Sequence, residues 1–247
     1  MKIFKLLIIG DEILSGKRKD CHLENAISLL SPRGFQLSQS LVIGDEPALI
    51  ISSLRMMGDE NSVVFCFGGI GATPDDYTRQ CAADAFLQPI TRHPEATRLI
   101  EAQFSEAAYP KRILMADLPE HAAIVPNPIN QVPGFSVGDC HFFPGFPQMA
   151  KPMMEWVLEN YYDLMRPVEP SIERSVLIYN QPESELIDLM NSILSTFPDV
   201  KIASLPKVEE RHSKIDLAVK GKEKAVERAF TFLLDYLDRE AIDYDVL

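Results

Sequence analysis

Cysteine is scarce in this sequence, and basic residues are fewer than acidic ones. The four cysteines (Cys21, Cys66, Cys81 and Cys140) lie far apart and form no C-x-x-C pair, which excludes a zinc ribbon and a disulfide framework. The five histidines form no H-E-x-x-H motif. Lys and Arg number 24 against 36 Asp and Glu, for a net charge of −12. This charge disfavours binding to nucleic acid or to an anionic membrane surface.

Long hydrophobic runs are also absent. The longest apolar runs, such as 6–9 and 63–67, are far too short to span a bilayer. The opening residues MKIFK lead directly into a strand-like run, with no signal peptide or cleavage site after them. We therefore expect a cytoplasmic protein without a membrane segment.

The first 90 residues alternate apolar strands with amphipathic helices. The run 63–67 is continuously apolar, as in a parallel-sheet strand that is covered on both faces. Hydrophobic periodicity predicts strands at 3–9, 35–43 and 63–67, and helices at 23–30, 49–57 and from 74 to about 86. This order predicts right-handed βαβ units in a three-layer α/β sandwich with a mostly parallel sheet.

The pattern loosens after residue 87 and changes again at 167–170, where two prolines mark a linker. Before the linker, the sequence predicts a helix at 95–107, short strands at 110–145, and a last helix whose apolar stripe holds Met149, Met153, Trp156, Val157 and Leu164. After it, a compact βαββα unit is predicted from strands at 172–178, 200–205 and 214–219 and helices at 183–197 and 222–239. The acidic tail from 240 is expected to fray. We thus predict two domains, 1–166 and 171–247.

The segment GGIGATPDDYT (68–78) is the strongest candidate for a ligand site. It follows a buried strand, and ligands of open α/β sheets bind at that edge. Its glycines allow the backbone to approach a phosphate closely with outward N–H groups. Thr73 is expected as the N-cap of a helix that begins at Pro74 and adds its positive end to the site. The alternative is a tight turn whose acidic residues only cap that helix.

Two further strand ends carry small and acidic residues. The strand at 3–9 leads into Gly10, Asp11 and Glu12, and the strand at 35–43 leads into Gly44 and Asp45. In a parallel sheet all three turns lie at one edge. Carboxylates beside a phosphate site would repel the anion unless a divalent cation lies between them, and Mg²⁺ prefers such oxygen-rich sites. Each carboxylate alone could instead cap a helix or face solvent.

The runs GDEILSG (10–16), VIGDEPALI (42–50) and GGIGATPDDYT resemble the molybdopterin-binding (Mog/MoaB-like) domain in the form found in competence/damage-inducible protein A, CinA. The runs PNPINQVPGF (126–135) and FFPGFPQMAKPM (142–153) are similar to later segments of that family. The resemblance covers about 3–165, and 171–239 resembles the small KH-like domain that follows in CinA proteins. It does not include the C-terminal amidase domain of that family.

The resemblance implies roles for particular residues. Asp45 and Asp76 align with catalytic or metal-associated carboxylates, and with Asp75 they form the expected metal site. The expected phosphate- and ligand-binding residues are Gly10, Asp11, Glu12, Ser15, Gly16, Asp20, Gly68, Gly69, Gly71, Thr73, Pro144 and Gly145.

The sequence departs from the family pattern at three places: Cys21 and His22 replace a Thr-Asn pair, 129–132 replaces a Gly-Thr-Ala stretch, and the usual Glu before Met149 is missing. His22 could be a base or a ligand contact, or it could simply pack. RNA binding by the KH-like unit is not expected, because its only glycine is Gly221 and it lacks a GXXG loop.

The function implied by the resemblance is binding of a phosphorylated nucleotide or pterin with Mg²⁺ by a homo-oligomer, and metal-dependent pyrophosphate hydrolysis of ADP-ribose or a related nucleotide. Two alternatives stay open. One is molybdopterin binding or nucleotidyl transfer in molybdenum-cofactor biosynthesis. The other is a binding module for a nucleotide or pterin that performs no catalysis.

Overall fold

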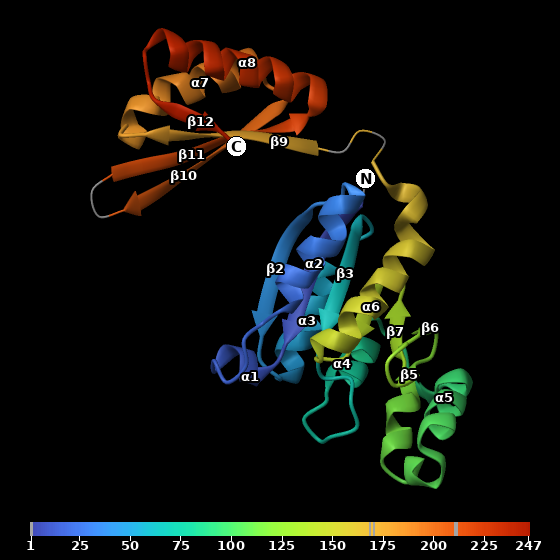
Figure 1. The fold of residues 1–247 in the computed structure, drawn as a ribbon. Helices are drawn as coiled ribbons and strands as arrows, with labels where there is room; N and C mark the ends of the chain where they lie inside the picture. Colours follow the sequence, from blue (N-terminus) through green and yellow to red (C-terminus); the bar gives the residue numbers. More distant parts are fainter. Residues whose placement is uncertain (1, 168, 170, 210–211) are drawn as a thin grey trace. The chain divides into compact units, whose positions relative to one another are not determined.

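A computed structural model describes residues 2–167, 169, 171–209 and 212–247 (Figure 1). The chain divides into two compact units, Met1–Arg166 and Pro167–Leu247. Two residues of the predicted linker, 168 and 170, lie outside the described residues. No helix in the described part of the chain is long and apolar enough to cross a bilayer.

A six-stranded sheet with the order β2-β1-β3-β8-β7-β6 forms the centre of the first unit (Figure 1). Its first four strands are parallel, β7 is antiparallel to β8, and β6 is antiparallel to β7. The strands are β1 (Ile3–Ile9), β2 (Leu37–Ile43), β3 (Ser62–Phe67), β6 (Ala123–Val125), β7 (Gly134–Val137) and β8 (Cys140–Phe143). The predicted mostly parallel α/β sheet is confirmed.

Helices cover both faces of this sheet, so the predicted three-layer sandwich is confirmed as well. Phe4, Leu6 and Ile8 of β1 pack with α2 (His22–Leu30) and α6 (Pro147–Val157). Leu7 and Ile9 pack on the other side, with α3 (Pro47–Met57), α4 (Thr78–Ala85) and α5 (Pro94–Phe104). This alternation follows from the two-residue period of a strand. All six residues of β3 are buried, as its continuous apolar run predicts.

Shorter elements connect these layers. A one-turn helix, α1 (Asp11–Leu14), follows β1, and a separate antiparallel pair is formed by β4 (Ile90–Arg92) and β5 (Asp117–Pro119). The 3₁₀ segments are η1 (Ser31–Arg33), η2 (Ser105–Ala108) and η3 (Arg112–Ala116). The predicted short strands at 110–145 are therefore present, whereas the helix predicted to reach 107 ends at Phe104.

The helical spacing of Leu23, Ala26, Ile27 and Leu30 predicts that these four residues form the buried side of α2, and the structure differs. Leu23 and Ile27 are exposed, whereas Ala26, Leu29 and Leu30 are buried against the sheet. The helix begins at His22, which is also buried. The side of the helix that packs on the sheet is thus shifted by about one residue from the periodicity of its leucines and isoleucine.

The predicted start of α4 at Pro74 is wrong, because the helix begins at Thr78. Local hydrogen bonds hold 73–77 in a turn: the Asp76 carboxylate accepts the Thr73 N–H (2.8 Å), and the Asp76 N–H donates to the Thr73 carbonyl (3.0 Å). Threonine and aspartate side chains often compete with helix formation in this way. Thr73 is therefore not the N-cap of α4.

The end of the last helix of the first unit also differs from the prediction. After α6 the chain forms a π-helix, η4 (Leu158–Tyr162), and then a 3₁₀ turn, η5 (Asp163–Met165). A π-helical turn holds more residues than an α-helical turn and rotates the side chains that follow it. Met153 and Val157 are buried as expected, but Leu164 is 100% exposed, so it does not belong to the buried stripe.

The second unit has a four-stranded antiparallel sheet with the order β10-β11-β9-β12. Its elements are β9 (Ser171–Tyr179), η6 (Glu183–Leu186), α7 (Ile187–Thr196), β10 (Val200–Glu209), β11 (His212–Lys222), α8 (Glu223–Arg239) and β12 (Tyr244–Val246). Residues of α7, α8 and the sheet form one core. The predicted βαββα order is thus observed, together with one further strand.

That additional strand corrects the expectation of a frayed tail. β12 pairs with β9 through 244–246, and the Tyr179 hydroxyl donates to Asp245 at 2.7 Å. The Tyr179 N–H donates to the carbonyl of Asp243. The edge of β9 supplies backbone N–H and C=O groups that bond to the tail. These bonds order the tail despite its negatively charged side chains.

Candidate functional site

The carboxyl ends of four parallel strands meet at one edge of the sheet in the first unit. The chain leaves β1, β2, β3 and β8 at this edge and enters four loops that begin with Gly10, Gly44, Gly68 and Pro144. A cavity of about 670 Å³ opens here, lined by Asp11, Glu12, Leu14, Ser15, Lys17, Asp45 and Asp75. The structure therefore brings together residues from all three turns that the sequence singled out.

Asp11 and Asp45, at the ends of β1 and β2, form reciprocal hydrogen bonds between side chain and backbone. The Asp11 N–H donates to Asp45 Oδ2 at 2.9 Å, and the Asp45 N–H donates to Asp11 Oδ1 at 3.3 Å. Each carboxylate keeps its second oxygen without a donor among the described residues. The pair can thus offer one oxygen from each strand end to a bound ligand.

The cavity is electrostatically negative. Burial raises the pKa of Asp45; the hydrogen bond from the Asp11 N–H opposes this, and the charges of Asp11, Glu12 and Asp75 add to the rise. Lys17 is the one basic residue that lines the cavity in the described structure. This environment favours a positively charged group beside Asp45.

The glycine turn after β3 presents a row of backbone donors. The N–H groups of Gly69, Ile70, Gly71 and Ala72 donate to no acceptor in the described ranges. The turn itself is fixed, because Gly69 accepts the Thr78 N–H and Gly68 accepts the Thr78 hydroxyl, both at 2.9 Å. Successive free N–H groups that converge on one point are a known means of binding anions.

The glycines of this turn are required by the fold as well as by a ligand. Gly68 has a φ of 101°, and a Cβ there would lie 2.2 Å from the carbonyl oxygen of Ile9. Gly69 has a φ of 67°, and a Cβ there would lie 2.3 Å from Thr78 Oγ1. The sequence predicted a sharp turn and the close approach of a ligand. The structure adds a packing reason for the same residues.

The three expected metal ligands are not arranged alike. Asp45 and Asp75 line the cavity, whereas Asp76 does not. Asp76 Oδ2 accepts both the N–H and the hydroxyl of Thr73. Within the described residues, no group of three or more His, Cys, Asp or Glu side chains could hold a metal ion. Among these described residues, a complete three-carboxylate metal site is therefore not found.

Asp20 and His22 support the loop instead of lining the cavity. Asp20 accepts the N–H groups of His22 (2.8 Å) and Leu23 (3.1 Å), and so caps α2. The buried His22 ring stacks on the Phe67 ring, with 4.4 Å between the ring centroids. Burial lowers the pKa of His22, against the charge of Asp20 and a hydrogen bond to the Gly145 backbone, which raise it. The packing interpretation of His22 thus fits its surroundings.

The loop after β8 lies directly against the glycine turn. A Cβ at Gly145 would lie 3.4 Å from the Gly68 Cα atom. The next residue, Phe146, is about half exposed, and the Arg18 guanidinium lies 5.7 Å from its ring centroid. Arg18 also lies 3.7 Å from a Glu12 carboxylate oxygen. The sequence did not single out Phe146, although a large aromatic residue after Pro-Gly in an edge loop was a usable signal.

Family comparison identifies the first unit. A family model described as "Probable molybdopterin binding domain" matches residues 5–164. The chain belongs to this family. A second model, described as "FAD synthase, middle domain", matches residues 172–246, which is the unit that the sequence likened to a KH-like domain.

Individual relatives agree with the predicted CinA resemblance. A CinA-like protein of Desulforapulum autotrophicum is 27% identical over 100% of this chain and 62% of its own length. Another, from Syntrophotalea carbinolica, is 30% identical over 73% of this chain and 46% of its own length. The chain thus spans only part of these relatives, while it covers 98% of an Archaeoglobus fulgidus protein that is 28% identical.

A solved structure supports the same fold. The crystal structure of CinA from Thermoplasma acidophilum matches 64% of this chain and 97% of its own length, with a TM-score of 0.59 and 25% sequence identity.

Proposed function

We propose that the first unit binds a phosphorylated nucleotide or pterin at the carboxyl edge of its sheet. The observation that carries this proposal is the set of free N–H groups from Gly69 to Ala72, in the same loop as Asp75, which lines a cavity of about 670 Å³. The donors suit phosphate oxygens, and the cavity has the size of a small-molecule site. The family description, "Probable molybdopterin binding domain", supports a ligand of this class.

A divalent cation, with Mg²⁺ as the expected ion, fits the carboxylates of this cavity. Mg²⁺ in proteins is usually held by one or two carboxylates, with waters and substrate phosphates as its other ligands. Asp11 and Asp45 each have one oxygen without a donor in the described structure. The raised pKa of Asp45, which comes first from burial, marks a position where a cation would be stabilising. Asp75 lines the same cavity and adds negative charge beside Asp45.

We further propose that the unit hydrolyses the pyrophosphate of ADP-ribose or a related nucleotide. A water oxygen would bond to one phosphorus as the bridging P–O bond breaks, which yields two phosphate monoesters. A bound cation supplies neutralisation of the phosphate charge. The free N–H groups after Gly68 would stabilise charge that develops on the phosphate oxygens. Asp45, with its raised pKa, would orient the water and accept its proton.

Asp76 is the second proposed catalytic carboxylate. Its Oδ2 holds Thr73, and its Oδ1 has no donor in the described part of the turn. In this role Asp76 would fix the shape of the donor row and leave one oxygen for the water or the cation.

The family description also favours a second candidate function, which is molybdopterin binding or nucleotidyl transfer to it in molybdenum-cofactor biosynthesis. It would use the same donors and carboxylates. A binding module without catalysis would use them too.

Calorimetry and product analysis test these proposals together. ADP-ribose, NAD, FAD, ATP and molybdopterin are titrated with and without Mg²⁺, and AMP release from ADP-ribose is followed by chromatography. Asp45→Asn and Asp76→Asn should each lower turnover by about two orders of magnitude or more. Glu46→Gln is the matched control, since Glu46 is exposed in the same turn and its side chain makes no capping bond.

Each outcome decides between the alternatives. Tight binding of one ligand without turnover would favour the binding module, and adenylated product from ATP and molybdopterin would favour nucleotidyl transfer. Wild-type protein that binds none of the five ligands would overturn the proposed site.

A further inference from the structure

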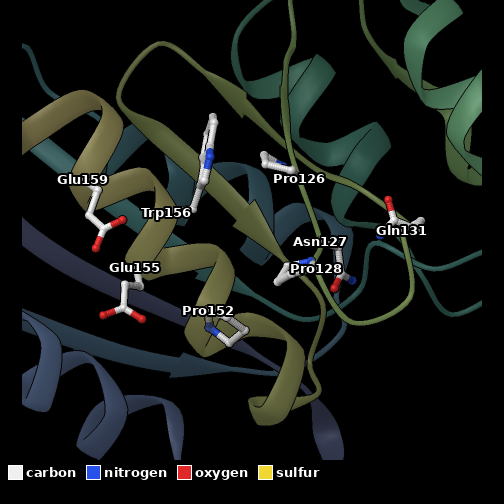
Figure 2. A pocket seen from close by; sticks show the side chains of 8 residues that line it. All are labelled: Pro126, Asn127, Pro128, Gln131, Pro152, Glu155, Trp156 and Glu159. Carbon is white, nitrogen blue, oxygen red and sulfur yellow. The ribbon is translucent and has the colours of Figure 1, made fainter.

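A second cavity, of about 430 Å³, lies between α6 and the loop that follows β6 (Figure 2). It shares no lining residue with the cavity at the carboxyl edge. The lining residues are Pro126, Asn127, Pro128, Gln131, Pro152, Glu155, Trp156 and Glu159. Its volume is in the range of small-molecule sites.

Four of the eight lining residues carry rings. Figure 2 shows Trp156 on α6 opposite Pro126 and Pro128 of the loop, with Pro152 further along the helix. The indole is only partly buried, although it packs against the core below it. The sequence predicted Trp156 as a core residue. The structure gives it a core contact on one side and the cavity on the other.

Hydrogen bonds of the Asn127 side chain hold the loop wall of the cavity. Asn127 is 3% exposed, and its amide group donates to Asn130 Oδ1 at 2.7 Å and to the Val132 carbonyl at 3.0 Å. Its carbonyl oxygen accepts the Ile129 N–H at 3.0 Å. All polar atoms of this buried side chain are therefore used within the loop, which fixes the shape of the cavity.

The charge of the lining is negative. Glu155 and Glu159 lie one helical turn apart, and a single Arg33 Nη2 lies 3.4 Å and 3.5 Å from their carboxylates. Arg33 does not line the cavity, and its Nη1 donates to the Leu29 carbonyl. One guanidinium thus holds two carboxylates in place and leaves a net negative charge, with no basic residue among those that line the cavity. Such a lining repels phosphates and attracts cations.

We propose that this cavity binds a small organic cation, in which an ammonium group is carried on an apolar stem. The cation would lie over the face of Trp156, since tryptophan gives the strongest cation–π attraction of the aromatic side chains. The stem would pack on Pro126, Pro128 and Pro152, and the ammonium N–H groups would bond to Glu155 and Glu159. The net charge of −12 draws such cations to the protein.

The protein carries its own reporter for this site, because Trp156 is its single tryptophan. Titration of the full chain with cadaverine or spermidine should change tryptophan emission in a saturable way. Pentanediol, the neutral analogue of cadaverine, and sodium chloride at matched ionic strength should not produce this change. The double variant Glu155→Gln/Glu159→Gln should bind the amines at least about tenfold more weakly than wild type.

Three controls make the result decisive. Glu106→Gln changes an exposed carboxylate elsewhere in the first unit and should bind as wild type does. Asp45→Asn should also bind the amines normally, since it alters only the cavity at the carboxyl edge. Trp156→Leu, followed by calorimetry because it removes the reporter, should lose binding while circular dichroism shows a folded protein.

The proposal is overturned if the emission does not respond to any amine at millimolar concentration. It is equally overturned if salt alone reproduces the change, or if Glu155→Gln/Glu159→Gln binds as tightly as wild type.

Discussion

The Nε2 atom of His141 lies 2.7 Å from the hydroxyl oxygen of Tyr162, and both side chains are almost fully buried. The Tyr162 hydroxyl donates to Asp139 Oδ1 at 2.7 Å, so His141 must donate to it from Nε2. His141 Nδ1 then accepts from the Ser136 hydroxyl, also at 2.7 Å. This chain of hydrogen bonds ties the β7–β8 hairpin to the π-helix η4, and it uses residues that no sequence motif marks.

Removal of the Tyr162 hydroxyl should destabilise the first unit. Tyr162→Phe leaves His141 Nε2 without its acceptor and Asp139 Oδ1 without its donor, while Lys2 still donates to Asp139 Oδ2. An unsatisfied buried polar group costs about 1–3 kcal/mol. Urea unfolding followed by circular dichroism measures the change. Tyr161→Phe is the control, since Tyr161 is 44% exposed and should unfold as wild type does. Equal unfolding free energies for the two variants would show that the network contributes nothing.

Stability should fall in acid because of His141. Burial lowers the pKa of His141 to about 4, although the charge of Asp139 opposes this. A base with a lowered pKa in the folded state stabilises the fold above its unfolded pKa, near 6.5, and that contribution is lost as the pH falls toward 4. The loss approaches about 3 kcal/mol at the acid end.

The variant His141→Gln should be less stable at pH 7 but should lose less stability between pH 6.5 and 4 than wild type. Urea titrations across that range measure both slopes. His121→Gln, at a histidine that is 76% exposed, should keep the wild-type slope. A His141→Gln slope that matches wild type would assign the acid sensitivity to another group.

Ionised Asp45 should lower the stability of the first unit when no metal is bound. An acid whose pKa is raised in the folded state destabilises the fold once it ionises, and the pKa of Asp45 is raised first by its burial. Without metal at pH 7, Asp45→Asn should therefore have a higher melting temperature than wild type. Mg²⁺ should raise the melting temperature of wild type and leave the variant nearly unchanged. The reverse order of melting temperatures would mean that ionised Asp45 is structurally satisfied.

Gly68 should be intolerant of alanine for a structural reason. Gly68→Ala places a Cβ 2.2 Å from the Ile9 carbonyl oxygen at a φ of 101°, and we expect a loss of about 3 kcal/mol or more. Gly138→Ala is the matched control, because its φ is 56° and no atom lies within 4 Å of the added Cβ. That substitution should cost only about 1 kcal/mol. Thermal unfolding compares the two, and similar losses would contradict the packing argument.

The sequence predicted those parts of the fold that depend on local pattern. β1 matches its predicted range, 3–9, because a buried strand must alternate its side chains between two apolar layers. The start of α4 could not be predicted in the same way. Pro74 and Thr73 suit a helix start, but the side chain of Asp76 bonds to Thr73 and holds the turn.

The candidate site shows the same division. The common edge of Asp11, Asp45 and Asp75 follows from the parallel order of the strands. The hydrogen bonds between Asp11 and Asp45 depend on the distance between two loops, and this distance cannot be predicted from the sequence. The hydrogen-bond chain of His141 could not be predicted from the sequence for another reason. It depends on the π-helical turn that brings Tyr162 to the hairpin, and neither periodicity nor spacing encodes that turn.

The short strand β12 has a consequence for association between copies of the chain. Without it, the nine-residue β9 would be an outer strand whose unpaired backbone groups could accept a foreign strand. With β12 paired to it, β9 becomes an inner strand, and β12 forms the edge of the sheet instead. β12 has three residues, includes Asp245 and directly follows Asp243. A negatively charged edge strand is a poor template for intermolecular strand pairing, and with β12 in place β9 has no open edge for a foreign strand.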